Sequence, residues 1–197
     1  MAEAPLWVKR YIGGVVAGSR VLDLACGSGR HISLARELGY AVTGIDRNIA
    51  AAKQLFDHDG RVELIEKDLE DGSAFPFAPQ SFGGVIVTNY LFRAVLAYVV
   101  DAVASDGMLL YETFRIGNER YGRPSRSDFL LRPGELISVV TSKLTVIAYE
   151  DVTLSEPARV VQRICAVGAL HPWIDQPPHV SECRSADSLE PERGRHR

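Results

Sequence analysis

The sequence predicts one α/β domain built on a doubly wound, mostly parallel sheet. Short apolar runs of strand length alternate with segments of helical periodicity, which is the pattern of repeated strand–helix–strand units. The run at 85–88 (VIVT) is almost entirely apolar, as expected of a strand buried on both faces of a parallel sheet. The run at 20–24 (RVLDL) leads into a glycine cluster and a helical segment, which indicates a buried strand followed by a tight turn.

The expected strands are short apolar runs bounded by turn residues. They cover residues 20–24, 41–45, 62–66, 85–88, 108–113, 144–150 and 159–168. The last two runs are separated by residues 151–158, a connection too short for a crossover helix. We therefore expect them to form an antiparallel hairpin at the edge of the sheet.

Helices are expected between these strands. They cover residues 30–38, 48–56, 91–104 and 132–140. Gly39 suits the C-terminal end of the first helix, and Asn48 suits the N-terminal cap of the second. Pro133 lies where a proline is tolerated, near the first turn of the last helix.

The first 19 residues form an amphipathic lead-in. Apolar side chains recur in it at helical spacing, and we expect them to cover one edge of the core; they are Leu6, Trp7, Tyr11 and Ile12. Trp7 and Tyr11 leave two interpretations open, a lid over a bound ligand or packing at the edge. Packing is the favoured one.

Length and composition fit a single domain with one core. The chain has 197 residues, of which 46% are hydrophobic. From His171 onward, prolines are followed by a charged stretch with almost no large apolar residues. We expect a domain over residues 1–170 and a disordered tail over residues 171–197.

Charge and cysteine usage exclude several classes of protein. A net charge of −3 and a pI of about 6.0 disfavour nucleic acid as a partner. Cys26, Cys165 and Cys183 are too scattered for a disulfide framework or a metal knuckle, so we expect no metal site and a reducing, cytoplasmic location. No secretory signal is expected, and no apolar run approaches the roughly 20 residues that span a bilayer. The oligomeric state is left open.

The strongest local signal is the segment 21–30 (VLDLACGSGR), in which a strand enters a turn of small residues before a helix. Gly27 and Gly29 allow the backbone to approach a ligand closely, and the helix N-terminus offers unpaired N–H groups. A dinucleotide enzyme would need a third glycine where Ile32 stands. The carboxylate of Asp23 would also repel a pyrophosphate, whereas it would attract a cationic ligand such as S-adenosylmethionine.

Polar residues follow the next three strands at the points where those strands end. Asp46 lies 19 positions after Gly27, where a carboxylate can accept both ribose hydroxyls of an adenosine. Asp68, with the backbone N–H of Leu69, can contact the adenine edge. Asn89 and Tyr90 follow the fourth strand, on the side expected for the methionine part of the ligand.

These segments together resemble a known family. VLDLACGSGRH, GIDRN, EKDLED and VIVTNYLF are similar to the successive motifs of class I S-adenosylmethionine-dependent methyltransferases, in particular the small bacterial single-domain type that resembles the tellurite-resistance methyltransferases. The resemblance covers about residues 5–168. It implies a Rossmann-like, seven-stranded sheet with an antiparallel last strand. The cofactor-binding residues that it implies are Asp23, Ala25, Cys26, Gly27, Gly29, Asp46, Arg47, Asp68, Leu69 and Asn89.

Less can be predicted about the methyl acceptor. The loop at 88–91 lacks the Asn/Asp-Pro-Pro-Tyr/Phe pattern of enzymes that methylate amide or exocyclic nitrogens. His31, Tyr90 and Glu112 are weak candidates for a general base, and Cys26 as a nucleophile is disfavoured because no base accompanies it. The absence of a clear base slightly favours a small, soft acceptor such as a thiol or a metalloid anion.

The long polar segment 112–132 follows a central strand and carries five arginines. It is either a solvated loop held by ion pairs or a lid whose arginines clamp an anionic acceptor. The second interpretation assigns substrate contacts to Tyr90, Arg115, Arg120 and Tyr121. Phe114 and Tyr121 are the aromatic residues on which a nucleic-acid base would have to stack, an alternative that the overall charge does not favour.

The function expected from the sequence is methyl transfer from S-adenosylmethionine to a small-molecule acceptor. The alternative is a protein that binds S-adenosylmethionine without catalysis, as a sensor or a partner subunit. An NAD-dependent oxidoreductase is disfavoured by Ile32 and Asp23.

Overall fold

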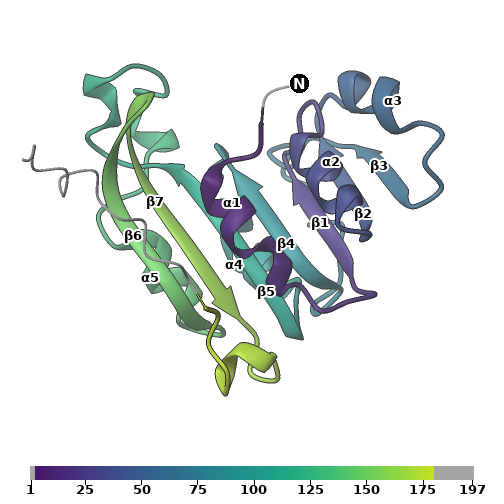
Figure 1. Ribbon diagram of the computed structural model, residues 1–197. Coiled ribbons are helices and arrows are strands. Elements are labelled where there is room, and N and C mark those ends of the chain that lie inside the picture. Colours follow the sequence, from purple (N-terminus) through teal and green to yellow (C-terminus); the bar gives the residue numbers. More distant parts are fainter. Residues whose placement is uncertain (1–2, 180–197) are drawn as a thin grey trace, which may run out of the picture.

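The computed structural model describes residues 3–179. Within these residues one sheet has the strand order β3-β2-β1-β4-β5-β7-β6 (Figure 1). Its strands are β1 (Arg20–Leu24), β2 (Ala41–Asp46), β3 (Val62–Glu66), β4 (Phe82–Thr88), β5 (Val103–Phe114), β6 (Thr145–Ser155) and β7 (Ala158–Val167). This is the predicted fold class, a seven-stranded, mostly parallel sheet.

The order of the strands places a switch point at the centre of the sheet. From β1 the chain builds outward through β2 to β3, and it then returns to pair β4 on the other side of β1. All of these pairings and that of β4 with β5 are parallel, whereas β7 is antiparallel to both β5 and β6. The antiparallel last strand is therefore confirmed. Ligands in such open sheets bind beyond the carboxyl ends of the strands, next to the switch point.

Helices cover both faces of the sheet (Figure 1). They are α1 (Leu6–Tyr11), α2 (Arg30–Glu37), α3 (Ala50–Phe56), α4 (Leu96–Asp101) and α5 (Glu135–Val140). Side chains of α1, α2 and α3 pack into one apolar core, and those of α4 and α5 pack into a second core on the opposite face. No helix within residues 3–179 is long and apolar enough to cross a membrane.

The central strand β4 is longer than expected. Its first residues include two glycines, which weaken the strand pattern in the sequence. We expected the strand to begin at Val85, whereas it begins at Phe82. A Cβ atom on Gly83 would lie 2.3 Å from the Ser19 Cβ, and one on Gly84 would lie 2.9 Å from a methyl of Val15. The glycines therefore allow the segment before β1 to pack directly on β4.

The elements around β4 and in the terminal hairpin also differ from expectation. In place of a continuous helix over 91–104, a 3₁₀ turn (Arg93–Val95) precedes α4, and β5 begins two residues after α4 ends. The expected connection 151–158 is mostly strand, because β6 and β7 pair up to Ser155 and Ala158. The predicted antiparallel hairpin itself is confirmed.

The lead-in helix α1 packs against the sheet. Trp7 and Tyr11 are buried, and the Trp7 Nε1–H donates to the carbonyl oxygen of Ile164 at 3.2 Å. The packing interpretation is confirmed for both side chains. Leu6 was wrongly placed on the buried face, since it is 80% exposed.

The packed domain extends beyond residue 170. A 3₁₀ turn (Pro172–Ile174) follows His171, whose buried ring lies 2.9 Å from the Gly14 carbonyl oxygen through Nε2. Trp173 packs against the core that contains α1. The start of the disordered tail was therefore predicted too early in the sequence. The part of the predicted tail from residue 180 onward lies outside the described residues.

Candidate functional site

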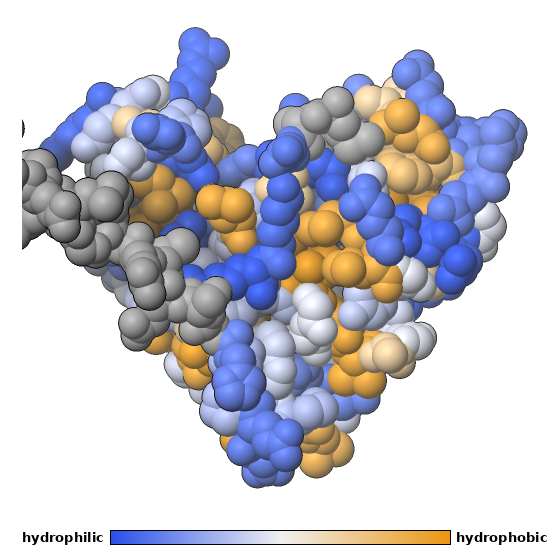
Figure 2. Space-filling view, viewed as in Figure 1, coloured by the Kyte–Doolittle hydropathy of each residue, from blue (hydrophilic) through white to orange (hydrophobic). Residues whose placement is uncertain are grey.

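A pocket of about 410 Å³ lies at the carboxyl ends of the parallel strands. It extends from the end of β2, past the tips of β1 and β4, to the end of β5 and the segment after it. Figure 2 shows the molecule hollowed at this end, with apolar side chains on the slopes of the hollow. The volume lies within the range of roughly 300–1,000 Å³ typical of small-molecule sites.

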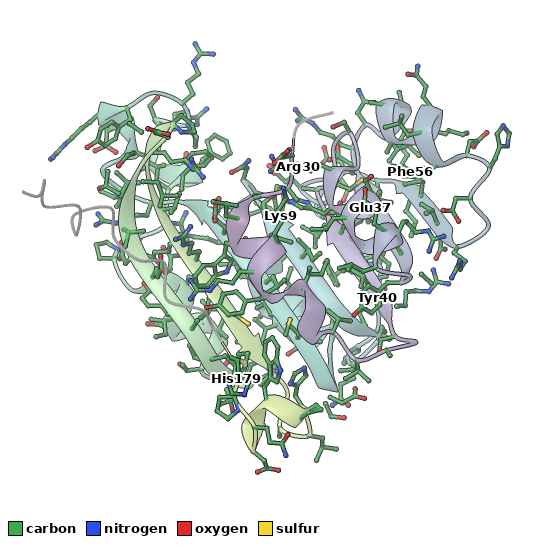
Figure 3. The ribbon with its side chains drawn as sticks, viewed as in Figure 1. Lys9, Arg30, Glu37, Tyr40, Phe56 and His179 are labelled. Carbon is green, nitrogen blue, oxygen red and sulfur yellow. The ribbon has the colours of Figure 1, made fainter. Side chains whose placement is uncertain are left out.

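The glycine turn forms part of this end of the molecule. Ala25, Gly27 and Gly29 have φ values of 57°, 54° and 84°, a left-handed region in which non-glycine residues are uncommon. A Cβ atom on Gly27 would meet nothing within 4 Å, so this residue faces open space, whereas one on Gly29 would lie 2.6 Å from the Phe56 ring. Figure 3 shows Arg30 and Phe56 at this end, and Tyr40 toward the other end of the sheet.

Asp46 ends β2 with its carboxylate turned toward the glycine turn. Its Oδ2 accepts the Gly27 backbone N–H at 2.9 Å, and its Oδ1 accepts the Asn48 N–H at 3.0 Å. Each oxygen keeps a further lone pair for another donor. Asp46 and Arg47 both line the pocket, as does Ala25. The carboxylate is therefore fixed in orientation and still able to accept hydrogen bonds from a ligand.

The loop after β3 supplies further polar side chains. Asp68 accepts the Glu70 backbone N–H at 2.8 Å, and the loop begins where the Lys67 N–H donates to the Asp46 carbonyl oxygen at 2.9 Å. Asp68 and Leu69, both predicted, line the pocket together with Lys67 and Glu70. Lys67 and Glu70 were not predicted, because no spacing in the sequence distinguishes them from ordinary polar loop residues.

The loop after β4 lines the middle of the pocket. Asn89 has a φ of 56°, and its backbone N–H donates to the Glu112 carbonyl oxygen at 2.9 Å. The buried Tyr90 hydroxyl has no hydrogen-bond partner among residues 3–179. Burial, and then the negative charge of Glu70, raise the pKa of Tyr90. Its hydroxyl is therefore protonated at neutral pH and unsuited to act as a general base.

Asp23 and His31 do not line the pocket. Asp23 is fully buried, and its Oδ1 lies 3.1 Å from the His31 Nδ1. The other ring nitrogen of His31 is 3.4 Å from the Thr88 hydroxyl, to which the Arg30 guanidinium donates at 2.8 Å. The Asp23 carboxylate holds α2 against β1 in this structure, and its predicted ligand contact stays a prediction.

Cys26 and Glu112 are also enclosed by protein. Burial raises the pKa of the Cys26 thiol, and the nearby carboxylates of Asp23 and Asp46 act in the same direction. Glu112 is 2% exposed and lies 3.4 Å from a guanidinium nitrogen of Arg159. Glu112 is an ion-paired residue of the sheet that does not line the pocket, and its role as a base stays a prediction.

The arginines expected to clamp the acceptor face elsewhere. Arg115, Arg120 and Tyr121 line a separate hollow of about 230 Å³ against the β6–β7 hairpin. The Arg115 Nε donates to the Asp151 Oδ1 at 2.5 Å. The ion-pair interpretation describes Arg115, whereas these arginines do not line the strand-tip pocket and the anion clamp stays a prediction. The sequence could not indicate this, because Asp151 comes from a distant strand.

Four residues that were not predicted close the pocket beyond β4. Thr113 and Phe114 come from the end of β5, and Pro124 and Phe129 from the segment that follows. The only signal for them was the unusual length of that segment. Among residues 3–179 no cluster of His, Cys, Asp and Glu side chains suits a metal ion.

Comparisons with known proteins agree with this geometry. Residues 21–107 match the family model described as a methyltransferase domain, whereas no curated protein matches the chain. Among solved structures, an S-adenosylmethionine-dependent methyltransferase from Methanosarcina mazei is 18% identical, with a TM-score of 0.63, and the alignment covers 86% of this chain and 100% of that one. TehB from Haemophilus influenzae is 17% identical, with a TM-score of 0.62 and coverages of 82% and 61%.

A third similar structure contains two bound molecules. It is the Burkholderia thailandensis 1,6-didemethyltoxoflavin-N1-methyltransferase with 1,6-didemethyltoxoflavin and S-adenosylhomocysteine, 16% identical, with a TM-score of 0.59 and coverages of 81% and 75%. Residues 21–107 of this chain are thus similar to the methyltransferase-domain family, and the chain has the fold of the class I S-adenosylmethionine-dependent methyltransferases.

Proposed function

We propose that this protein transfers a methyl group from S-adenosylmethionine to a small-molecule acceptor. The observation that carries the proposal is the Asp46 carboxylate, which is held by the Gly27 N–H at 2.9 Å on the wall of the strand-tip pocket. The cytoplasmic location, and a small molecule in place of nucleic acid as the partner, stay predictions.

The residues present fit S-adenosylmethionine. Asp46 has free lone pairs for the two ribose hydroxyls, and Asp68 with the Leu69 N–H suits the adenine edge. The open space at Gly27 allows the methionine part to lie close to the backbone, toward Asn89. When bound, the sulfonium of this cofactor supplies an already activated methyl group.

The chain then has little chemistry left to supply. Bound S-adenosylmethionine would supply the methyl carbon and a neutral thioether leaving group that keeps the carbon–sulfur electron pair, so the acceptor would need to supply only a lone pair. A proton on a thiol acceptor passes to water. The protein's part is to align the acceptor and to exclude water. This division suits a pocket in which Tyr90 stays protonated and Glu112 is ion-paired elsewhere.

Calorimetry with S-adenosylhomocysteine tests the cofactor assignment. We expect micromolar binding to the wild-type protein. Asp46→Ala should weaken it by about 150-fold or more, because two hydrogen bonds to a charged group are lost, each worth about 1.5–3 kcal/mol. Asp57→Ala is the matched control, since Asp57 is exposed and outside the pocket. Equal affinity in the two variants would contradict the assignment.

The second candidate function is binding of S-adenosylmethionine without catalysis. It is favoured by one observation, that none of the three candidate bases is placed to deprotonate an acceptor in the pocket. Incubation with methyl-labelled S-adenosylmethionine and thiol, oxyanion and carboxylate acceptors separates the two functions. Label transfer to any acceptor excludes pure binding, whereas tight binding with no transfer to any acceptor favours it.

A further inference from the structure

The far end of the strand-tip pocket is formed by uncharged residues. Thr113, Phe114, Pro124 and Phe129 line it, and we call these four residues the aromatic wall. Because β4 lies between β1 and β5 in the sheet, the wall is on the opposite side of β4 from Asp46. A ligand whose ribose contacts Asp46 therefore leaves this end for the acceptor.

Charged side chains of the same segment are paired or lie outside the pocket, although the Arg126 Cζ lies over the Phe129 ring, 5.5 Å from its centroid. Arg115 pairs with Asp151 at 2.5 Å, Arg126 pairs with Asp128 at 3.3 Å, and Arg120 lines the separate hollow beside the hairpin. None of these arginines lines the strand-tip pocket. An acceptor placed against the wall therefore meets no charged pocket-lining residue at this end, so removing a charge from water there is costly.

The backbone on both sides of Phe129 is anchored by Arg93. Its guanidinium donates to the carbonyl oxygens of Asp128 and Leu130, each at 2.8 Å. The same guanidinium contacts both carboxylate oxygens of Glu135 at 2.7 and 2.9 Å, a bidentate geometry that fixes its orientation. Phe129 lies between the two anchored carbonyls, so its backbone is held in place before any ligand binds.

The aromatic side chains of the wall still expose their rings. Phe129 is 40% exposed, and Phe114 is only half-buried. Aromatic faces in a recess gain most from another flat apolar surface, which removes water from both partners. A second ring stacked there would cover area that the native fold leaves open.

We propose that the aromatic wall binds an uncharged, planar aromatic molecule as the methyl acceptor. The inference rests on the proposed function, whose cofactor fills the other end of the pocket. It replaces the anionic acceptor expected from the arginines by a neutral one, and it assigns the specificity to Phe114 and Phe129.

The test uses protein saturated with S-adenosylhomocysteine and two probes of the same shape, 2-naphthol and 2-naphthoate, with tellurite as a small anion. Dissociation constants are measured by ligand-observed NMR. We expect 2-naphthol to bind about tenfold or more tightly than 2-naphthoate. Phe129→Ala should weaken 2-naphthol roughly 3- to 10-fold, and Arg120→Ala should leave it unchanged. Phe129→Lys should reverse the preference in favour of 2-naphthoate.

Affinity for S-adenosylhomocysteine separates the two ways to fail. If the cofactor product binds to each variant as to the wild type, and 2-naphthol does not bind or binds more weakly than either anion, the neutral aromatic acceptor is overturned while the proposed function stands. Loss of affinity in Arg120→Ala but not in Phe129→Ala overturns it as well. If the wild-type protein does not bind S-adenosylhomocysteine, the proposed function fails and this inference falls with it.

Discussion

The buried contact between Asp23 and His31 should stabilise the fold. The two side chains are 0% and 4% exposed, and their contact of 3.1 Å joins β1 to α2. His31→Ala removes the partner of the Asp23 Oδ1, and the Oδ2 already has no hydrogen bond among residues 3–179. The whole carboxyl group would then be buried without a partner.

The expected loss follows from two contributions. A buried polar group left unsatisfied costs about 1–3 kcal/mol, and the space left by the imidazole ring adds a cavity term. We expect His31→Ala to lower the free energy of unfolding by about 3 kcal/mol. Asp23→Ala removes the same contact, so the double variant should be less destabilised than the sum of the singles by about 1–2 kcal/mol.

Urea unfolding at neutral pH measures the free energy of unfolding of the wild type, the two single variants and the double variant. His58→Ala is the matched control, because His58 is exposed and should change stability by no more than about 0.5 kcal/mol. A coupling energy below about 0.5 kcal/mol would refute the structural role of the contact. So would a loss in His31→Ala as small as that of the control.

Two further predictions concern pH and the glycine turn. Burial lowers the pKa of His171, whose neutral ring donates to the Gly14 carbonyl and accepts the Trp173 N–H. Below a pH of about 6.5 the unfolded chain takes up a proton that the native state does not, so the free energy of unfolding should fall from pH 7 to pH 5. His171→Gln should flatten this dependence, and an unchanged slope in urea unfolding would contradict the prediction. Gly27→Ala should cost about 1–2 kcal/mol of stability because φ is 54°, and its Cβ, projecting into open space beside Asp46, should weaken S-adenosylhomocysteine about tenfold. Calorimetry that finds unchanged affinity in a folded variant would contradict this role for the turn.

The fold could be predicted largely because its signals are local. Strand β1 and strand β3 match their expected bounds, since each is an apolar run closed by turn residues. The spacing from Gly27 to Asp46 correctly brought together a turn and a strand end, because parallel strands end at the same edge of the sheet. Strand β4 was predicted too short, because Gly83 weakens the strand pattern in the sequence. In the structure Gly83 is part of the strand, and its missing side chain leaves room for Ser19.

The parts that could not be predicted depend on contacts between distant segments. Arg115 pairs with Asp151, 36 positions away, and the sequence pattern of the segment alone left an ion-paired loop and an anion clamp both open. His171 contacts Gly14 across 157 positions, so composition alone suggested that the tail begins at residue 171. Phe129 lines the pocket, and Arg93, 36 positions earlier, anchors the carbonyls on both sides of it.

A crystal structure of the complex with S-adenosylhomocysteine tests the central claim most directly. The account predicts both ribose hydroxyls within about 3.2 Å of the Asp46 carboxylate oxygens, with the ligand's sulfur toward Asn89. The end of the pocket lined by Phe114 and Phe129 should be left free. An adenosine bound away from Asp46, or a ligand that fills the aromatic wall with its own adenine ring, would contradict the account.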